Sequence, residues 1–491
     1  MGSPLPVSDN YSSYLGGAGV EQAFAVATDQ AGNVYAAGYT ASSDFPVTAG
    51  ALQTSLRGYD GFVTKFDPSG SQLMFSTFIG GNQSIPGGTD GVTAIVVDQN
   101  GSAFVAGWTS AQDFPVTGGA FDTTHNGGGD IFVSKLDPSG SRLEYSTYIG
   151  GSDFETAYSL AIAPNGDLLV AGWTYSTDFP LTPGAIDSAC TSSSGQCRDA
   201  FLLRLDWNGS ALVFSTYLGG TQVEYGLSVA LGPGGDIFAM GTTASADFPT
   251  TIGALQPANA GGTDAWVARL DGFGTRLVYS TYLGGSNEEF PHSHFVELAG
   301  AIAIDRSGVA YVTGVTFSSD FPMTQTSFDN SANGDRDVFL TAIVPNGTSL
   351  VFSPYLGGRS YEYGIGIALD SNGSALVVGR SASADFPLTV GSGGRTCGQP
   401  GNLFFARFTE DGRGLWYSAC AGGGGDEAAR SVSLAPGGRA WVAGWTSSSD
   451  FPVTAGAYDL SFNGGGYDSF LLMLLPGEGG LPWPPVDRRI T

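Results

Sequence analysis

The chain has 491 residues, of which 42% are hydrophobic and 13% charged, and its formal net charge at pH 7 is −26. So acidic a surface repels phosphate backbones and anionic lipids, so nucleic acid and membrane surfaces are poor candidate partners, whereas cations are favoured. No apolar run is long enough to cross a membrane, and a chain with 76 Gly and 31 Phe is too aromatic to be disordered.

The chain opens with Met-Gly-Ser, and residues 1–10 contain no positively charged, apolar signal segment. We interpret residues 1–10 as a cloning or leader remnant. The next segment, Tyr-Ser-Ser-Tyr-Leu-Gly-Gly at 11–17, matches Tyr-Ser-Thr-Tyr-Leu-Gly-Gly at 279–285. The chain therefore begins with a segment that resembles the last strand of a later repeat, without the strands that precede it there.

From there on, one unit recurs along the chain. Its marker Asp-Phe-Pro starts at Asp44, Asp113, Asp178, Asp247, Asp320, Asp385 and Asp450. In the third unit, alternating segments at 156–163, 168–174, 200–206 and 212–218 are separated by turns such as Pro-Asn-Gly-Asp and Trp-Asn-Gly-Ser. Period-two segments with Gly-containing turns predict hairpins, and no segment has a helical pattern.

Four strands repeated seven times predict an all-β fold, a single seven-bladed β-propeller with antiparallel blades. The expected blades are 21–81, 90–151, 155–220, 224–285, 297–358, 362–423 and 427–475. The last repeat stops after its third strand, so residues 11–17 are expected to supply the missing fourth strand and close the ring. A Pro/Gly-rich tail, 476–491, follows.

The motifs Tyr-Ser-Thr-Tyr-Leu-Gly-Gly, Gly-x-x-Thr and Asp-Phe-Pro resemble the bacterial beta-propeller repeat called SBBP, over about residues 11–475. The resemblance implies a seven-bladed propeller of the kind found in predicted exported bacterial proteins, often beside adhesion or surface modules. It implies no defined reaction, because a shared fold does not establish one.

The four cysteines form two local pairs. Cys190 and Cys197 lie in one polar loop, and Cys397 and Cys420 lie in a single repeat. Neither pair has the spacing of metal ligands, so we expect two disulfides, Cys190–Cys197 and Cys397–Cys420, with four buried thiols as the alternative. Disulfides favour an extracellular or cell-surface location.

An acid stands nine positions before the first hairpin turn of every repeat. These acids are Glu21, Asp90, Glu155, Glu224, Glu297, Glu362 and Glu427. We expect them at the mouth of the central channel, on the top face, which carries the loops from strand two to strand three and from strand four to the next blade. Such a ring can bind Ca²⁺. The favoured alternative is a hydrogen-bonded clasp with the Thr or Ser that ends strand two and the Asp that leads strand three.

Blade five carries an insertion, residues 286–296, with two of the three histidines of the chain. His292 and His294 are two residues apart and point the same way in an extended segment. With Glu288 they can bind Zn²⁺, or one can act as a general base. The alternative is a plain covering loop. The third histidine, His125, is expected to be solvated in a Gly-rich loop.

One position just before the strand-two hydroxyl differs between blades. It holds Tyr39, Trp108, Trp173 and Trp445 in four neighbouring blades, and Arg380 in blade six. Aromatic rings near the channel mouth can stack on sugars, and Arg380 can pair with a uronate or sulfate. The alternative is that these side chains fill the wedge between blades.

These features predict an exported, non-catalytic propeller that binds a glycan or a cell-surface protein on its top face and requires no cofactor. The alternative is a polysaccharide lyase or hydrolase that uses the His-x-His insertion. A second alternative is a structural subunit that assembles with copies of itself.

Overall fold

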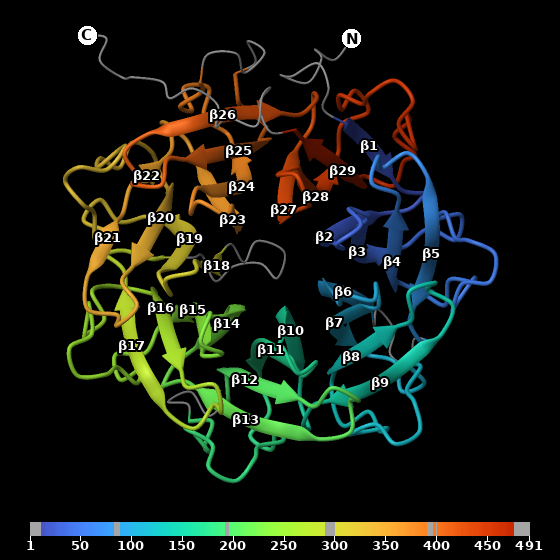
Figure 1. Ribbon diagram of the computed structural model, residues 1–491, viewed down its shortest axis with the longest axis horizontal. Coiled ribbons are helices and arrows are strands. Elements are labelled where there is room, and N and C mark those ends of the chain that lie inside the picture. The colour runs from blue at the N-terminus through green and yellow to red at the C-terminus, as the bar shows by residue number, and fades with distance from the viewer. Residues whose placement is uncertain are drawn as a thin grey trace.

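The computed structural model describes residues 11–82, 89–191, 196–289, 300–389, 396–398 and 400–475. Seven antiparallel sheets stand in a ring around a central axis, with one edge of each sheet toward the centre (Figure 1). Within these ranges all regular elements are strands, so no helix there could span a membrane. The predicted seven-bladed β-propeller is confirmed.

The strands repeat in the same order in every blade. The first, innermost strands are β2 (Glu21–Thr28), β6 (Asp90–Val97), β10 (Glu155–Ile162), β14 (Glu224–Leu231), β18 (Ala301–Ile304), β23 (Glu362–Leu369) and β27 (Glu427–Leu434). The second strands are β3 (Val34–Thr40), β7 (Ala103–Thr109), β11 (Leu168–Thr174), β15 (Ile237–Thr243), β19 (Ala310–Thr316), β24 (Ala375–Ser381) and β28 (Ala440–Thr446).

The third strands are β4 (Asp60–Phe66), β8 (Asp130–Leu136), β12 (Asp199–Leu205), β16 (Asp264–Leu270), β20 (Asp337–Ile343), β25 (Asn402–Phe408) and β29 (Asp468–Leu474). The outermost, fourth strands are β5 (Leu73–Ile79), β9 (Leu143–Ile149), β13 (Leu212–Leu218), β17 (Leu277–Leu283), β21 (Leu350–Phe352) with β22 (Tyr355–Leu356), β26 (Leu415–Ala421) and β1 (Tyr11–Leu15). The break between β21 and β22 falls at Pro354, which has no N–H to donate to a ladder.

The N-terminal strand closes the ring, as predicted. β1 pairs antiparallel with β29, Tyr11 lying opposite Met473 and Leu15 opposite Ser469. Tyr14 is buried, and its hydroxyl donates to the Ser448 carbonyl at 2.7 Å and accepts from the Phe451 N–H at 3.0 Å. The strand is therefore integrated into blade seven by side chains as well as by its backbone.

The hydrophobic core is divided among the junctions between neighbouring blades. Buried apolar side chains form seven clusters, each with members from two adjacent sheets. The phenylalanine of every Asp-Phe-Pro motif contributes by packing on an aromatic ring of strand three, as Phe114 does on Phe132 with ring centroids 4.4 Å apart. The Asp-Phe-Pro loop is thus fastened to its own blade.

Both predicted disulfides are present. Cys190 is bonded to Cys197 within the loop before β12, and Cys397 is bonded to Cys420 in β26. The second bond ties the loop between strands two and three of blade six to the outermost strand of the same blade. The described part of the chain has no free cysteine.

Closure by β1 can be tested by comparing the same substitution at Tyr14 and at Tyr217. Tyr217 occupies the equivalent position in the fourth strand of blade three, and its hydroxyl also donates to a backbone carbonyl. Replacing a buried aromatic ring with Ala costs about 3–5 kcal/mol. We expect Tyr14→Ala and Tyr217→Ala to lower the free energy of unfolding by similar amounts in urea titrations. A much smaller loss for Tyr14→Ala would show that β1 is not part of the cooperative unit.

Candidate functional site

The acids predicted at the channel mouth lie inside the junctions between blades. Glu21 begins β2 and is fully buried. Its Oε1 accepts hydrogen bonds from the hydroxyls of Thr40, at 2.7 Å, and Ser42, and its Oε2 accepts the Gly17 N–H at 2.9 Å. Gly17 follows β1, the outermost strand of blade seven, so one carboxylate joins two strands of blade one to the neighbouring blade.

The same arrangement recurs around the ring. The strand-two hydroxyl donates to the acid at 2.6–2.9 Å in Thr109–Asp90, Thr174–Glu155, Thr243–Glu224, Thr316–Glu289, Ser381–Glu362 and Thr446–Glu427. All seven acids are buried, with at most 1% exposure. For the six predicted acids that the structure describes, the expectation that they face the channel is therefore wrong, and their hydrogen bonds are those of the predicted clasp.

In blade five the junction acid is Glu289, not Glu297. Glu289 accepts from Thr316 at 2.8 Å and from the Gly285 N–H at 3.1 Å, as Glu21 does from its partners. Glu297 lies outside the described residues. Counting from the Gly-Gly pair would have identified Glu289, because the acid follows the second glycine by four residues in every blade except blade two. The insertion therefore follows the junction acid instead of preceding it.

A second acid shares each of six junctions. It is the Asp that begins strand three of the preceding blade: Asp60, Asp130, Asp199, Asp264, Asp337 and Asp468, all with at most 1% exposure. In every one of them Oδ1 is buried and has no hydrogen-bond partner among the described residues. A Cβ atom built on Gly80 would lie 2.7 Å from Asp60 Oδ1 and 2.9 Å from Asp90 Oδ2, so the two carboxyl groups meet at this glycine.

Burial raises the pKa of these paired acids far above the usual range of carboxyl groups. The pKa rises to about 6 for Asp60, about 7 for Asp130, Asp337 and Asp468, and about 8 for Asp199. The charge of the facing acid adds to the effect, as Glu224 does for Asp199. Two buried carboxylates in contact cannot both ionise readily. The pairs that contain Asp130, Asp199, Asp337 and Asp468 therefore retain a proton to a large extent near neutral pH, and the pair that contains Asp60 does so at slightly lower pH.

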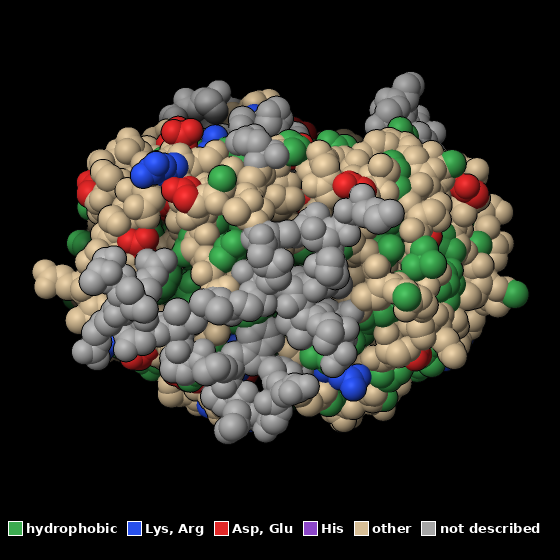
Figure 2. All heavy atoms as spheres, turned by 90° about the horizontal axis from the view of Figure 1, so that it is seen from above, with side chains coloured by type: hydrophobic (Ala, Val, Ile, Leu, Met, Phe, Trp, Pro, Cys, Tyr) green, Lys and Arg blue, Asp and Glu red, His purple; other side chains and the backbone are tan. Residues whose placement is uncertain are grey.

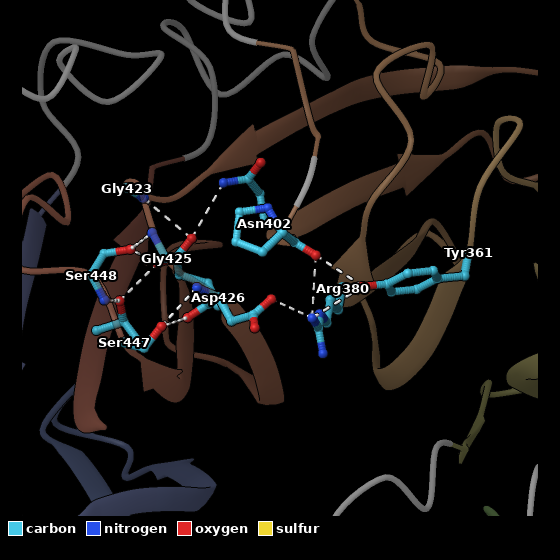
Figure 3. Close-up of polar contacts among 11 residues, drawn as sticks. Tyr361, Arg380, Asn402, Gly423, Gly425, Asp426, Ser447 and Ser448 are labelled. Carbon is cyan, nitrogen blue, oxygen red and sulfur yellow. Dashed lines mark hydrogen bonds and ion pairs between the residues drawn. The ribbon is translucent and has the colours of Figure 1, made fainter. Parts of the chain in front are cut away.

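The seventh junction, between blades six and seven, supports this interpretation. Asn402 begins β25 where the other blades have Asp, and its amide Nδ2 donates to Glu427 Oε2 at 3.3 Å (Figure 3). Glu427 also accepts the Gly423 N–H at 3.2 Å. An amide supplies the hydrogen that a protonated Asp supplies at the other junctions. Across the described residues, no group of three or more His, Cys, Asp or Glu is arranged to hold a metal ion.

The Asp-Phe-Pro aspartate is a further tie between blades. Asp44 Oδ1 accepts the N–H of Ala18, the residue after the Gly-Gly of blade seven, at 3.0 Å. The equivalent aspartates accept the corresponding N–H at 2.7–3.0 Å in the other six blades. Two recurring features of the repeat unit, the junction acid and the Asp-Phe-Pro motif, thus hold the backbone in place where every fourth strand ends.

The axis of the ring contains a cavity of about 690 Å³, which extends from the top face to the middle of the innermost strands. One arc of its wall is aromatic: Phe24, Tyr39, Tyr59, Trp108, Phe154 and Tyr158. The opposite arc is aliphatic, with Ile302, Ile365, Ile367 and Val432. Arg430 stands between them, its guanidinium carbon 5.5 Å from the centre of the Phe24 ring.

Only part of the predicted aromatic arc lines this cavity. Tyr39 and Trp108 do, and Trp108 Nε1 donates to Thr89 Oγ1 at 2.9 Å. Trp173 has 0% exposure and lies between Phe154 and Tyr225, and Trp445 is buried against Tyr467. Four further rings of the cavity wall, Phe24, Tyr59, Phe154 and Tyr158, stand at other positions of the repeat and were not predicted.

Arg380 is engaged by its own blade and the next one. Its guanidinium forms an ion pair with Asp426 and donates to the Tyr361 hydroxyl at 3.2 Å, and Figure 3 shows it directed at both. It also lies against the Tyr361 ring, at 5.4 Å. A guanidinium held by a carboxylate in this way is poorly placed to pair with a uronate or sulfate.

The histidine candidates, His292 and His294, lie outside the described residues. Glu288 precedes the junction acid of blade five, and its carbonyl accepts the Phe317 N–H at 3.0 Å. The expectation of a solvated His125 is wrong: its Nε2 is buried, its ring packs edge-on against Tyr148 at 5.8 Å, and burial lowers its pKa.

The fold and its junctions define a seven-bladed β-propeller built from one repeated unit. The sequence profile of the SBBP beta-propeller repeat matches residues 10–46, 75–115 and 351–387. The chain therefore carries SBBP repeats, which confirms the resemblance drawn from its motifs.

Other similarities are distant. The Regulatory protein FlaEY of Caulobacter vibrioides is 26% identical over 298 residues, which are 58% of this chain and 29% of FlaEY. Among solved structures, a PL25 ulvan lyase is 10% identical with a TM-score of 0.46, covering 91% of this chain and 96% of the lyase. Hydrazine synthase of Kuenenia stuttgartiensis is 13% identical with a TM-score of 0.44, covering 86% and 92%. These structural similarities do not indicate a function.

The paired acids make stability depend on pH. Their folded-state pKa values lie above those of the unfolded chain, so their contribution is complete below about pH 4 and is lost as the pH rises through about 6 to 8. We expect urea denaturation to give a lower free energy of unfolding at pH 8 than at pH 5, by on the order of 1–2 kcal/mol per pair.

Asn402 stands where the other six blades have Asp, so exchanging Asp and Asn at two junctions gives a matched pair of variants. Asp60→Asn should remove the contribution of one acid pair to the pH dependence of the free energy of unfolding. It should also stabilise the protein at pH 8, because the Asn amide donates a hydrogen bond at every pH. Asn402→Asp should do the reverse. Identical pH profiles for both variants and the parent protein would rule out proton sharing in the junctions.

Proposed function

We propose that the protein is an exported, non-catalytic binding module that holds a glycan in the central cavity, at its top face. The aromatic arc of that cavity carries the proposal. Six rings from three neighbouring blades gather on one side of an open space, although most other aromatic side chains of the repeats are buried between blades.

The cavity has the dimensions of a ligand site. Its volume of about 690 Å³ falls within the range of about 300–1,000 Å³ that small-ligand sites occupy. Tyr59 is 42% exposed at its rim, and Thr89, Thr93 and Thr156 add hydroxyls to the wall. Flat rings with a few hydroxyls suit a sugar, which has an apolar face and a polar edge. A protein partner is the alternative occupant.

Two disulfides support a location outside the reducing cytoplasm, because such bonds persist in oxidising compartments. Seven blades tied at every junction also suit a rigid scaffold. Stacking and hydrogen bonding need no cofactor, so none is part of this proposal.

The test is retention of the protein on immobilised polysaccharides, with release of new chain ends measured in the same samples. We expect Trp108→Ala or Tyr39→Ala to weaken retention about tenfold or more, because loss of a central aromatic contact costs about 2 kcal/mol. Trp207→Ala is the control: Trp207 is 63% exposed in a hairpin turn at the opposite end of its blade.

The other outcomes separate the alternatives. Release of chain ends that is lost in a His292→Ala/His294→Ala variant would make the protein an enzyme and overturn the proposal. Retention unaffected by Trp108→Ala would place the ligand elsewhere. Failure to bind any polysaccharide, with concentration-dependent assembly in size-exclusion chromatography, would favour the structural subunit.

A further inference from the structure

Positive charge is scarce in this protein, and most of it is neutralised locally. Acids outnumber Lys and Arg by 45 to 19, and on the side of the molecule seen in Figure 2 few basic side chains stand among the acidic ones. Carboxylates pair with Lys65, Lys135, Arg142, Arg204, Arg269, Arg276, Arg359, Arg380, Arg407 and Arg413. Arg198 and Arg336 are two of several arginines that form no ion pair with any described residue.

Arg336 lies at the top of the junction between blades five and six, among three aromatic rings. Its guanidinium carbon is 4.8 Å from the centre of the Phe317 ring, 5.2 Å from Tyr363 and 5.7 Å from Tyr361. Its Nη1 donates to the Tyr363 hydroxyl, and its Nε is buried without an acceptor in the described part of the chain. The rings hold the guanidinium in place, and no described carboxylate forms an ion pair with it.

The junction between blades three and four repeats this arrangement. Arg198 lies 4.8 Å from the centre of the Tyr175 ring. Burial raises the pKa of Tyr175 and Tyr225, and the positive charge of Arg198 opposes that rise. The positions are equivalent in the repeat: each arginine directly precedes the first Asp of strand three, Tyr175 and Phe317 follow the strand-two Thr, and Tyr225 and Tyr363 follow the junction acid. No other blade has an arginine at this position.

The blade-three copy is continuous with the central cavity. Tyr175 and Tyr225 pack on Trp173, with ring centroids 4.6 and 5.6 Å apart. Trp173 in turn packs on Phe154, which lines the cavity, at 5.7 Å. A chain of rings therefore leads from the cavity wall to Arg198, on the same face of the propeller.

We propose that Arg198 and Arg336 bind the acidic groups of an anionic polysaccharide that lies across the top face. The inference rests on the proposed function and deepens it, because it assigns the ligand to glycans that carry carboxylate or sulfate groups. Planar guanidinium groups donate to such oxygens in a bidentate manner, and stacking on Tyr or Phe reduces the freedom lost on binding. Two arginines at equivalent positions of blades three and five, with blade four between them, suit a polymer with repeated charges. Arg380, paired with Asp426, is not part of this site.

The experiment compares binding of polygalacturonate, dextran sulfate, uncharged dextran and poly-L-glutamate by titration calorimetry. The variants are Arg198→Gln, Arg336→Gln and the double variant. Arg306→Gln is the matched control, because Arg306 is an exposed arginine in a hairpin turn at the opposite end of blade five. Thermal unfolding of each variant shows whether it is folded, and Arg336→Lys retains the charge without the planar donors if Arg336→Gln fails to fold.

We expect the protein to bind one or both acidic polysaccharides at least about tenfold more tightly than dextran, and the double variant to lose this preference. Raising NaCl from about 50 to about 300 mM should screen the two arginines, so the ratio of the parent protein's affinity to that of the double variant should fall. Binding to polygalacturonate but not to dextran sulfate would identify the carboxylate as the recognised group, and the reverse would identify the sulfate.

Four outcomes would overturn the inference, and the fourth would also overturn the proposed function. Equal binding of dextran and the acidic polymers would refute it and leave the proposed function standing. Equal binding of poly-L-glutamate would show that saccharides are not the recognised class. Binding that persists in a folded double variant would remove both arginines from the site. Absence of binding to every polysaccharide would refute the proposed function itself.

Discussion

Every sheet in this protein buries both of its faces against neighbouring blades, and the remainder of the structure follows from that constraint. The apolar core is accordingly divided among seven junctions. Because strand ends also fall inside the junctions, their polar groups must find partners there, since an unpaired buried group is costly. The junction acid, with a hydroxyl and a backbone N–H, meets this need in every blade.

The repeated motifs consequently act together, because they contact one another at every junction. The first glycine of Gly-Gly leaves room for two carboxyl groups, as at Gly80 beside Asp60 and Asp90. The junction acid accepts the N–H of the second glycine, and the Asp of Asp-Phe-Pro accepts the N–H of the next residue. The phenylalanine of that motif packs under the same loop. A binding surface built on this frame can vary its rim residues, because the frame does not depend on them.

The blade count, the strand order and the closure by β1 could be predicted because turns and Asp-Phe-Pro recur at regular intervals. The site could be predicted only in part. Counting nine positions back from the hairpin turn predicts Glu297, but in blade five the insertion lies between the junction acid, Glu289, and that turn. Trp108 and Trp173 share one repeat position, yet Thr89 and Gly91 leave Trp108 open to the cavity while Phe154 and Tyr225 cover Trp173. Such differences depend on neighbours from other strands.

The Cys397–Cys420 bond stands where other blades use a weaker tie. In blades two to five and in blade seven, a tyrosine of strand four donates its hydroxyl to a carbonyl of the loop after strand two, as Tyr148 does to Ala111. Cys420 replaces that tyrosine, and a covalent bond replaces the hydrogen bond. Hydrogen-bonded outer strands can detach and rejoin as the protein fluctuates, whereas the outer strand of blade six cannot fray from its loop. The outer strand of blade six is thereby held to its blade by a covalent bond. This blade also contributes Asn402, instead of an Asp, to the junction with blade seven.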